Sequence, residues 1–185
     1  IIAGIAKGTR LHTLGKMDIR PTLDRVRETL FSILMPRIES ARFLDLFAGT
    51  GAIGLEALSR GADTVAVVEP ESKVQELIRD NIKKCRLSQA DWSLLSKTAS
   101  QAIRSLEQEN RRFDLVYVDP PFFEELYEQT LDQLAGSTLL EEEAWVVVEH
   151  FHKTELQRNY GRLTHIREKR LGDTRLSFFS FNRSG

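Results

Sequence analysis

The chain has 185 residues, of which 41% are hydrophobic, and a formal net charge of −1. This length is enough for one well-packed domain and short for two, so we predict a single domain over residues 1–185. The single cysteine, Cys85, excludes an intramolecular disulfide and a multi-cysteine zinc site and is typical of a reducing compartment. No apolar stretch approaches the roughly 18 residues of a membrane helix. We therefore expect a monomeric, cytoplasmic protein without a metal or a membrane partner.

The charge is unevenly distributed along the chain. Residues 1–42 carry eight Lys and Arg residues against four Asp and Glu, and residues 151–185 carry eight against three. A basic face on a nearly neutral protein can supply local contacts to phosphates. The competing interpretation is that these terminal segments are solvated surface, where lysine and arginine are common in any protein.

Residues 1–19 lack helical periodicity and contain glycines between short apolar pairs. This pattern predicts a β-rich arm that is either hairpin-like or irregular. Basic side chains decorate the segment, among them Lys7 and Arg10. We therefore expect residues 1–19 to form a basic arm that contacts the phosphates of a polyanion.

A helix is expected over residues 22–34. Three arginines lie at its start: Arg20, Arg25 and Arg27. Positive charge near the positive end of a helix dipole is unfavourable, which suggests that a phosphate or an acidic partner lies nearby. The acidic alternative for Arg20 and Arg27 is an ion pair with Asp24, with Glu28 or with a carboxylate across the fold.

Residues 43–58 carry the clearest chemical pattern in the chain. They begin as an apolar run, break at Gly49-Thr50-Gly51 and resume with apolar residues, which predicts a strand, a tight turn and a helix. Glycines let the backbone turn sharply and approach a ligand, and the helix N-terminus directs unpaired N–H groups towards it. The stretch is therefore typical of a nucleotide-cofactor site.

Two kinds of cofactor fit these glycines. Gly49-x-Gly51-x-x-Gly54, with Glu69 twenty residues after Gly49, also matches the dinucleotide fingerprint. Asp45 favours another ligand, because a carboxylate just before the turn would repel a pyrophosphate and attract a cation. S-adenosylmethionine carries a sulfonium and an α-ammonium group, and Glu69 can accept from its ribose hydroxyls. The structural alternative for Asp45 is a helix N-cap or a strand-end residue.

The rest of the chain alternates strands and helices. Strands are expected at residues 43–47, 64–69, 92–96, 113–119 and 144–150, and helices at residues 51–60, 71–84, 99–108 and 123–135. Regular alternation with short connections predicts a parallel sheet covered on both faces, with ligands outside the carboxyl ends of the strands. Residues 163–171 and 174–181 are β-rich and predict a terminal antiparallel hairpin. The predicted fold is α/β and Rossmann-like: a mostly parallel seven-stranded sheet with helices on both faces and a C-terminal hairpin, which methyltransferase folds carry and dinucleotide folds usually lack.

A second chemical motif, Asp119-Pro120-Pro121-Phe122, follows an apolar strand at the same edge of the predicted sheet. The two prolines stiffen the chain, so that Asp119 and the carbonyl group of Pro120 become fixed acceptors beside an aromatic ring. Two acceptors that bind the hydrogens of an exocyclic base amine favour a more tetrahedral nitrogen, while Phe122 stacks on the base. The structural alternative is a rigid strand-to-helix turn with Phe122 in the core.

Together these motifs resemble a known family, the bacterial methyltransferases that modify the N2 amine of one guanine in 16S ribosomal RNA, within the class I S-adenosylmethionine-dependent fold. The resemblance covers nearly the whole chain and rests on residues 20–31, 45–61, 119–122 and 172–174. The first block is the most specific, because it separates this family from other enzymes with Asp-Pro-Pro-like loops. The resemblance implies guanine 966 of an assembling small subunit as the substrate.

The resemblance also implies roles for individual residues. The base would be held by Asp119, Pro120, Pro121 and Phe122. The cofactor would be held by Asp45, Phe47, Ala48, Gly49, Thr50, Gly51, Glu69, Pro70, Thr98, Ala99 and Asp119. At Thr98 the chain departs from its relatives, which often have Asp or Asn after the third strand.

With RNA as the substrate, the phosphate contacts are predicted for Lys7, Arg10, Arg20, Arg25 and Arg27. Methyl transfer would be direct and in line, without a metal or a covalent enzyme intermediate. Two alternatives remain open from the sequence: a DNA adenine-N6 amino-methyltransferase and an NAD-type oxidoreductase. The second alternative leaves Asp45 and Asp119-Pro120-Pro121 unexplained.

Overall fold

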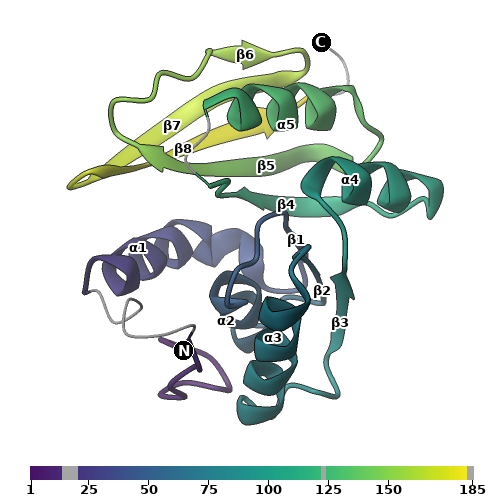
Figure 1. Cartoon of the computed structure of the whole chain (residues 1–185). Helices are drawn as coiled ribbons and strands as arrows, with labels where there is room; N and C mark the ends of the chain where they lie inside the picture. The colour runs from purple at the N-terminus through teal and green to yellow at the C-terminus, as the bar shows by residue number, and fades with distance from the viewer. Residues whose placement is uncertain (14–20, 122–123, 183–185) are drawn as a thin grey trace.

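The computed structural model describes residues 1–13, 21–121 and 124–182. Its helices are α1 (Pro21–Ile38), α2 (Ala52–Ser59), α3 (Ser72–Lys84), α4 (Ala99–Gln108) and α5 (Glu124–Gly136). Its strands are β1 (Arg42–Asp45), β2 (Thr64–Val68), β3 (Asp91–Leu95), β4 (Phe113–Val118), β5 (Leu140–Phe151), β6 (Asn159–Tyr160), β7 (Leu163–Leu171) and β8 (Thr174–Phe181). The strands form a sheet with α1, α2 and α3 on one face and α4 and α5 on the other (Figure 1).

The sheet confirms the predicted fold class. Its described strands have the order β3-β2-β1-β4-β5-β8-β7-β6, in which β1 to β5 are parallel and β8, β7 and β6 join antiparallel. The chain moves outwards from β1 in one direction and then returns to continue at β4, so a topological switch point lies between β1 and β4. Ligands of such sheets bind at that point, outside the carboxyl ends of the strands. All seven predicted strands are present, and the eighth, β6, has only two residues and leaves no pattern in the sequence.

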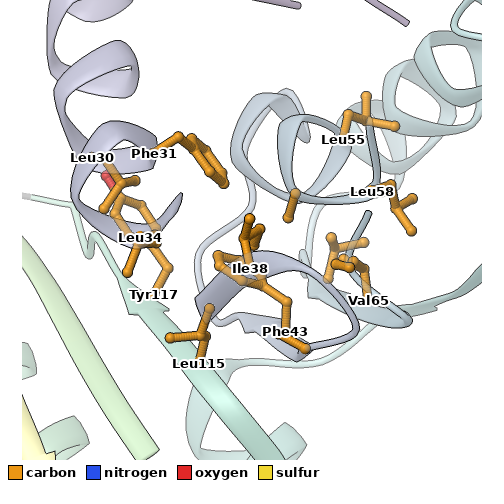
Figure 2. Close-up of a cluster of buried hydrophobic side chains, with 14 of the residues drawn as sticks. Leu30, Phe31, Leu34, Ile38, Phe43, Leu55, Leu58, Val65, Leu115 and Tyr117 are labelled. Carbon is orange, nitrogen blue, oxygen red and sulfur yellow. The ribbon is translucent and has the colours of Figure 1, made fainter. Parts of the chain in front are cut away.

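Alternating side chains of the parallel strands build two separate cores. Phe43, Val65 and Leu115 belong to the core under α1, α2 and α3 (Figure 2). Their chain neighbours Leu44 and Val116 belong to the core under α4 and α5. Burial on both faces explains why these strands read as continuous apolar runs. It also means that a charged residue at the end of such a run is held at the rim of a core.

Helix α1 is longer than the sequence pattern predicts, since it ends at Ile38 and not at Leu34. Ile38 is 4% exposed and packs with Leu34 in the core, so burial of this extra turn extends the helix even though Pro36 lies within it. Among the residues that the structure describes, no helix combines the length and the apolar character needed to cross a membrane.

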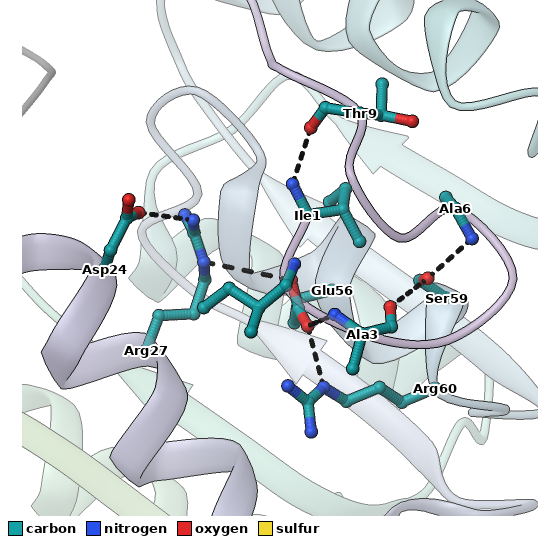
Figure 3. A network of polar contacts seen from close by, with 10 residues as sticks. Ile1, Ala3, Ala6, Thr9, Asp24, Arg27, Glu56, Ser59 and Arg60 are labelled. Carbon is teal, nitrogen blue, oxygen red and sulfur yellow. Dashed lines mark hydrogen bonds and ion pairs between the residues drawn. The ribbon is translucent and has the colours of Figure 1, made fainter.

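The described part of the N-terminal arm, residues 1–13, contains no strand, so the prediction of a β-rich arm is wrong there. The backbone N–H groups of Ile2 and Ala3 donate to the carboxylate of Glu56 at 2.8 and 3.0 Å (Figure 3). A strand needs a neighbouring strand to receive its backbone groups, whereas here a side chain of α2 receives them. The arm is therefore an irregular segment tied to a helix.

A second point of attachment lies one turn further along α2. The hydroxyl group of Ser59 accepts from the N–H of Ala6 at 2.9 Å and donates to the carbonyl of Ala3 at 2.6 Å. Gly4 has a φ of 80°, and a Cβ atom there would lie 1.7 Å from the carbonyl oxygen of Ser59. Only glycine fits this approach, which explains one of the arm glycines that the sequence pattern left as a turn signal.

Candidate active site

Four carboxylates lie at the carboxyl ends of the parallel strands, on the face that α1, α2 and α3 cover. Asp45 ends β1, Glu69 follows β2, Asp119 follows β4, and Glu149 lies in β5. Two positions before each carboxylate lies a residue of the core under α1, α2 and α3: Phe43, Val67, Tyr117 and Val147. Side chains two positions apart in a strand lie on the same face, so all four carboxylates lie on the face of this core. The sequence predicted three of these residues and missed Glu149. In the described part of the chain, no three His, Cys, Asp or Glu side chains are arranged to hold a metal ion.

Asp45 is a buried carboxylate with an incomplete set of partners. It is 1% exposed, its Oδ1 accepts from the N–H of Phe47 at 3.3 Å, and its Oδ2 is buried without a hydrogen-bond partner among the described residues. Burial raises the pKa of Asp45 to about 7, with a small further rise from Glu69, while backbone N–H groups of Phe47 and Gly54 oppose the shift. A buried polar atom without a partner requires an explanation, and a cationic ligand would supply one.

Asp45 ends β1, as the strand-end alternative predicts. It is not the N-cap residue of α2, so the N-cap alternative is wrong, although the N–H of Gly54 in the first turn of α2 bonds to its carboxylate. The N-cap of α2 is Gly51, which has a φ of 79° and no side-chain cap. No side chain of the N-cap residue therefore occupies the N–H groups of the first turn of α2. Gly49 has a φ of 50°, and no atom lies within 4 Å of where its Cβ would be, so the turn faces open space. Gly54 is needed for packing, because a Cβ there would lie 2.6 Å from a methyl group of Val67.

Glu69 lies beside the same turn. Its Oε1 accepts from the N–H of Glu71 at 2.9 Å, and the backbone of Gly49 also bonds to its carboxylate. Burial raises its pKa, and these two backbone bonds oppose the rise. Gln75 donates to the Glu69 carbonyl at 2.8 Å. Glu69 is therefore fixed by both adjoining loops, and its contact with ribose hydroxyls stays a prediction. Pro70, next to it, is exposed.

Thr98 and Ala99 lie at the start of α4, after β3. The hydroxyl group of Thr98 accepts from the N–H of Gln101 at 3.4 Å, and the side chain of Gln101 accepts from the N–H of Thr98 at 3.1 Å. This is a capping box, which stabilises the helix start. Thr98 thus has a structural role that explains it without a cofactor contact, although it lies at the predicted edge of the sheet.

Asp119 follows β4 and is an exposed residue at the end of that strand. Burial raises its pKa well above its ordinary value, with further rises from Glu149 and then Asp45. Water that reaches the exposed carboxylate weakens this shift, and a ligand that excluded the water would strengthen it. Pro120 is buried and Pro121 is exposed. Phe122 lies outside the described residues, so its stacking and core alternatives both stay predictions.

Tyr117 and Glu149 form a pair that sequence reasoning missed. Tyr117 is 2% exposed among Leu30 and Leu34 of α1 (Figure 2), and its hydroxyl group donates to Oε2 of Glu149 in a short hydrogen bond. Burial raises the pKa of Tyr117 well above its usual range, so it acts as a donor here. The sequence does carry a signal for Glu149: the apolar run of β5 ends in VVVE at Glu149, just as that of β2 ends in AVVE at Glu69.

The predicted basic residues divide into two groups. Lys7, Arg10 and Arg25 are exposed and stay predicted phosphate contacts. Arg27 is largely buried and pairs with Asp24 at 2.7 Å and with Glu56 at 3.8 Å, so the ion-pair alternative explains it. Arg20 lies outside the described residues.

The order of the strands, with antiparallel β8 between β5 and β7, and the carboxylates beside a glycine turn define a class I methyltransferase. The structure titled "Putative methyltransferase yhhF from Escherichia coli" superposes with a TM-score of 0.85 at 30% identity, covering 98% of this chain and 97% of that one. The chain belongs to the family described as Conserved hypothetical protein 95, whose model matches residues 1–180.

Curated relatives carry more specific names. The protein named Ribosomal RNA small subunit methyltransferase D in Escherichia coli (strain K12) is 39% identical over 149 residues, which are 80% of this chain and 73% of that protein. Its namesake in Haemophilus influenzae is 37% identical, over 80% of this chain and 77% of that protein. The family resemblance predicted from the sequence is thereby confirmed.

Proposed function

We propose that this protein transfers a methyl group from S-adenosylmethionine to the N2 amine of a guanine in 16S ribosomal RNA, by resemblance guanine 966, within an assembling small subunit. The names of the relatives support the RNA, and the observation that carries the cofactor is the buried, unpartnered Oδ2 of Asp45 beside the glycine turn. The protein would act as a cytoplasmic monomer, as one domain with residues 1–19 as an RNA-binding arm.

The residues at the glycine turn fit this cofactor. The Oδ2 atom of Asp45 can accept from an α-ammonium group, which would satisfy the orphaned oxygen and stabilise its charged form. Glu69 can accept from ribose hydroxyls, and the open space at Gly49 leaves room for the ligand against the backbone. The remaining predicted contacts are Phe47, Ala48, Thr50, Gly51, Pro70, Thr98 and Ala99. S-adenosylmethionine, when bound, supplies an electrophilic methyl group.

Asp119 and Pro120 are the groups of this chain that hold the target amine. The Asp119 carboxylate and the Pro120 carbonyl accept its two hydrogens and direct the nitrogen lone pair away from the base plane. Once the nitrogen is methylated it carries an extra proton, and Asp119 is the adjacent group that takes it. A pKa raised by burial, by Glu149 and by Asp45 suits a carboxylate to that task. The base must be everted to reach this position, at a cost of a few kcal/mol.

Contacts along the arm connect the proposed RNA grip with the cofactor site. Asn81 is fully buried, accepts from the N–H of His12 at 2.6 Å and donates to the carbonyl of Thr50 at 3.1 Å. The arm therefore runs from Glu56 on α2 to the glycine turn. Lys7 and Arg10 lie on its exposed side, where phosphates of the RNA can reach them.

The proposal is tested by transfer of a tritiated methyl group to 16S RNA and to small-subunit particles from cells that lack this protein, followed by nucleoside analysis. N2-methylguanosine is the expected product. N6-methyladenine formed in a parallel DNA substrate would instead support the DNA alternative, and no incorporation into any of the three substrates would overturn the assignment as a methyltransferase of nucleic acids. A comparison of particles with naked RNA shows which of them is the substrate.

A further inference from the structure

Glu149 lies next to Asp119 across two neighbouring strands. β4 and β5 are parallel, and their register pairs Val118 with Val148, so the residue after each of these valines continues the same pairing. Neighbouring strands lie about 4.8 Å apart, which brings the two carboxylates together at the edge where the target amine is proposed to bind. Their proximity is reflected in the pKa of Asp119, for which Glu149 is the largest cause of the rise after burial.

The structure fixes one oxygen of Glu149 and leaves the other without a donor. The hydroxyl group of Tyr117 donates to Oε2, and no described residue donates to Oε1. This bond favours the ionised form of Glu149, whereas no hydrogen bond in the described part of the chain does the same for Asp119. Two adjacent carboxylates without a cation are unfavourable, unless a ligand brings hydrogen-bond donors to both.

We propose that Glu149 determines the specificity of the enzyme for guanine, by accepting the N1–H of the target base while Asp119 and Pro120 accept from its N2 amine. The inference rests on the proposed function. The Watson–Crick edge of guanine presents N1–H and the N2 amine side by side as donors, and two neighbouring carboxylates are acceptors only. Tyr117 is a positioning residue, because it holds Oε2 and thereby aims Oε1.

The same arrangement rejects adenine. Adenine also has an exocyclic amine, but the ring nitrogen beside that amine is an unprotonated acceptor. Placed in this site, its lone pair would face the Glu149 carboxylate, and neither group could donate. A site built to hydrogen-bond a donor discriminates strongly against an analogue that lacks it, because the buried acceptor is then left unpaired. Asp119-Pro120 alone accepts any exocyclic amine, so the choice of base falls to Glu149.

The test compares two target bases in particles reconstituted from 16S RNA made by splinted ligation. One carries guanine at the target position, and the other carries 2-aminopurine, which keeps the 2-amine but has an unprotonated N1. Wild-type protein should methylate guanine at least about 100-fold faster. Glu149→Gln should reduce this preference roughly tenfold or more, because the glutamine amide can donate to the N1 lone pair of 2-aminopurine. 2-Aminopurine also lacks the oxygen at position 6, and this difference affects both proteins equally and cancels in the comparison.

A second readout does not depend on turnover. With S-adenosylhomocysteine in place of the cofactor, the affinity of the wild-type protein should be higher for the guanine particle than for the 2-aminopurine particle, and Glu149→Gln should narrow the difference. Glu143→Gln is the matched control, since it removes the same charge from an exposed position of the same strand and should keep the wild-type preference.

The outcomes separate this inference from the proposed function. An unchanged preference in Glu149→Gln would overturn the inference and leave Glu149 as a structural partner of Tyr117. Nearly equal methylation rates of the guanine and 2-aminopurine particles by the wild-type protein would also overturn the inference, and this result does not require the variant to fold. Failure of the wild-type protein to methylate the guanine particle would overturn the proposed function and the inference with it.

Discussion

Glu56 and Asp45 are both buried carboxylates of the same strand-turn-helix unit, and they differ in how fully they are paired. Glu56 is 0% exposed and receives the N–H groups of Ile2 and Ala3 together with the guanidinium of Arg60 at 2.7 Å (Figure 3). Asp45 is 1% exposed and accepts from the backbone N–H of Phe47 at 3.3 Å, with a further backbone bond from Gly54, while its Oδ2 has no partner among the described residues. Burial alone therefore does not show whether a carboxylate has its partners within the chain.

The two carboxylates differ in their hydrogen-bond partners, in line with the different roles that we propose for them. A buried charge is tolerated when it is paired and hydrogen-bonded, and each missing partner is a cost that the rest of the fold must offset. Glu56 has its partners within the chain and joins the arm to α2. Asp45 has one oxygen, Oδ2, without a partner among the described residues, and burial raises its pKa to about 7.

Loss of the Glu56 side chain should have the largest effect. In Glu56→Ala the two arm N–H groups and Arg60 lose their shared acceptor, and breaking a buried pair costs about 3–5 kcal/mol of unfolding free energy. Denaturant unfolding measures this change. Glu76→Ala, at an exposed position of α3, is the control and should change stability little. A loss below 1 kcal/mol in Glu56→Ala would mean that the arm is not tied to α2 through this residue.

Asp45→Asn should act on the cofactor and spare the fold. A charge-assisted hydrogen bond is worth roughly 1.5–3 kcal/mol, so calorimetry should show S-adenosylmethionine affinity falling by about 10- to 100-fold. The melting temperature of the cofactor-free protein should not fall, because the neutral amide avoids burying a charge. Unchanged affinity in a folded variant would remove Asp45 from the cofactor site.

The raised pKa of Asp45 predicts a dependence of stability on pH. Its pKa is about 7 in the folded state against an ordinary value of 3.8, so between these values the folded state binds more protons than the unfolded one. Stability of the cofactor-free protein therefore decreases as the pH rises from about 4 to about 7, by at most about 1.4 kcal/mol per pH unit from this group.

Glu69, Asp119 and Glu149 have raised pKa values and add slopes of the same sign. Urea unfolding at pH 5, 6 and 7 gives the free energy of unfolding of wild type and of Asp45→Asn. The difference between their slopes with pH is the contribution of Asp45. Equal slopes in the two proteins would contradict a raised pKa for Asp45. Cofactor binding at pH 6 should also release protons, which calorimetry in buffers of different ionisation enthalpy detects.

Asp119 should separate chemistry from cofactor binding. In Asp119→Ala the target amine loses an acceptor and the group that takes its proton, so the single-turnover methylation rate should fall by more than about tenfold while S-adenosylmethionine affinity changes little. Equal losses in rate and affinity would place Asp119 in the cofactor pocket.

The smallest expected effects concern the arm. Lys7→Ala or Arg10→Ala should each reduce the slope of log RNA affinity against log salt by about 0.7–0.9 without changing stability. Arg27→Ala is the contrast, because this residue pairs with Asp24 and Glu56 and should lower the melting temperature without changing the salt slope. If the salt slope is unchanged in both Lys7→Ala and Arg10→Ala, the RNA-binding surface lies elsewhere, for example at the basic residues around Lys169 and Arg170.

Local patterns in the sequence predict the architecture and the two carboxylates that we propose hold the cofactor. Apolar runs of strand length that alternate with amphipathic stretches specify a parallel sheet, because both signals depend only on local periodicity. The same holds for Asp45 and Glu69, each of which ends such a run beside a turn. Residue type and spacing alone therefore placed them at one edge of the sheet.

Which carboxylates find hydrogen-bond partners within the chain depends on tertiary packing. Glu56 takes its partners from the arm, more than fifty residues away in the chain, and Glu149 takes the hydroxyl group of Tyr117 from another strand. The arm reads as β-rich in the sequence because glycines and short apolar pairs suit a hairpin, yet its backbone groups bond to α2. Partners of this kind are set by packing between distant segments, which no local pattern records.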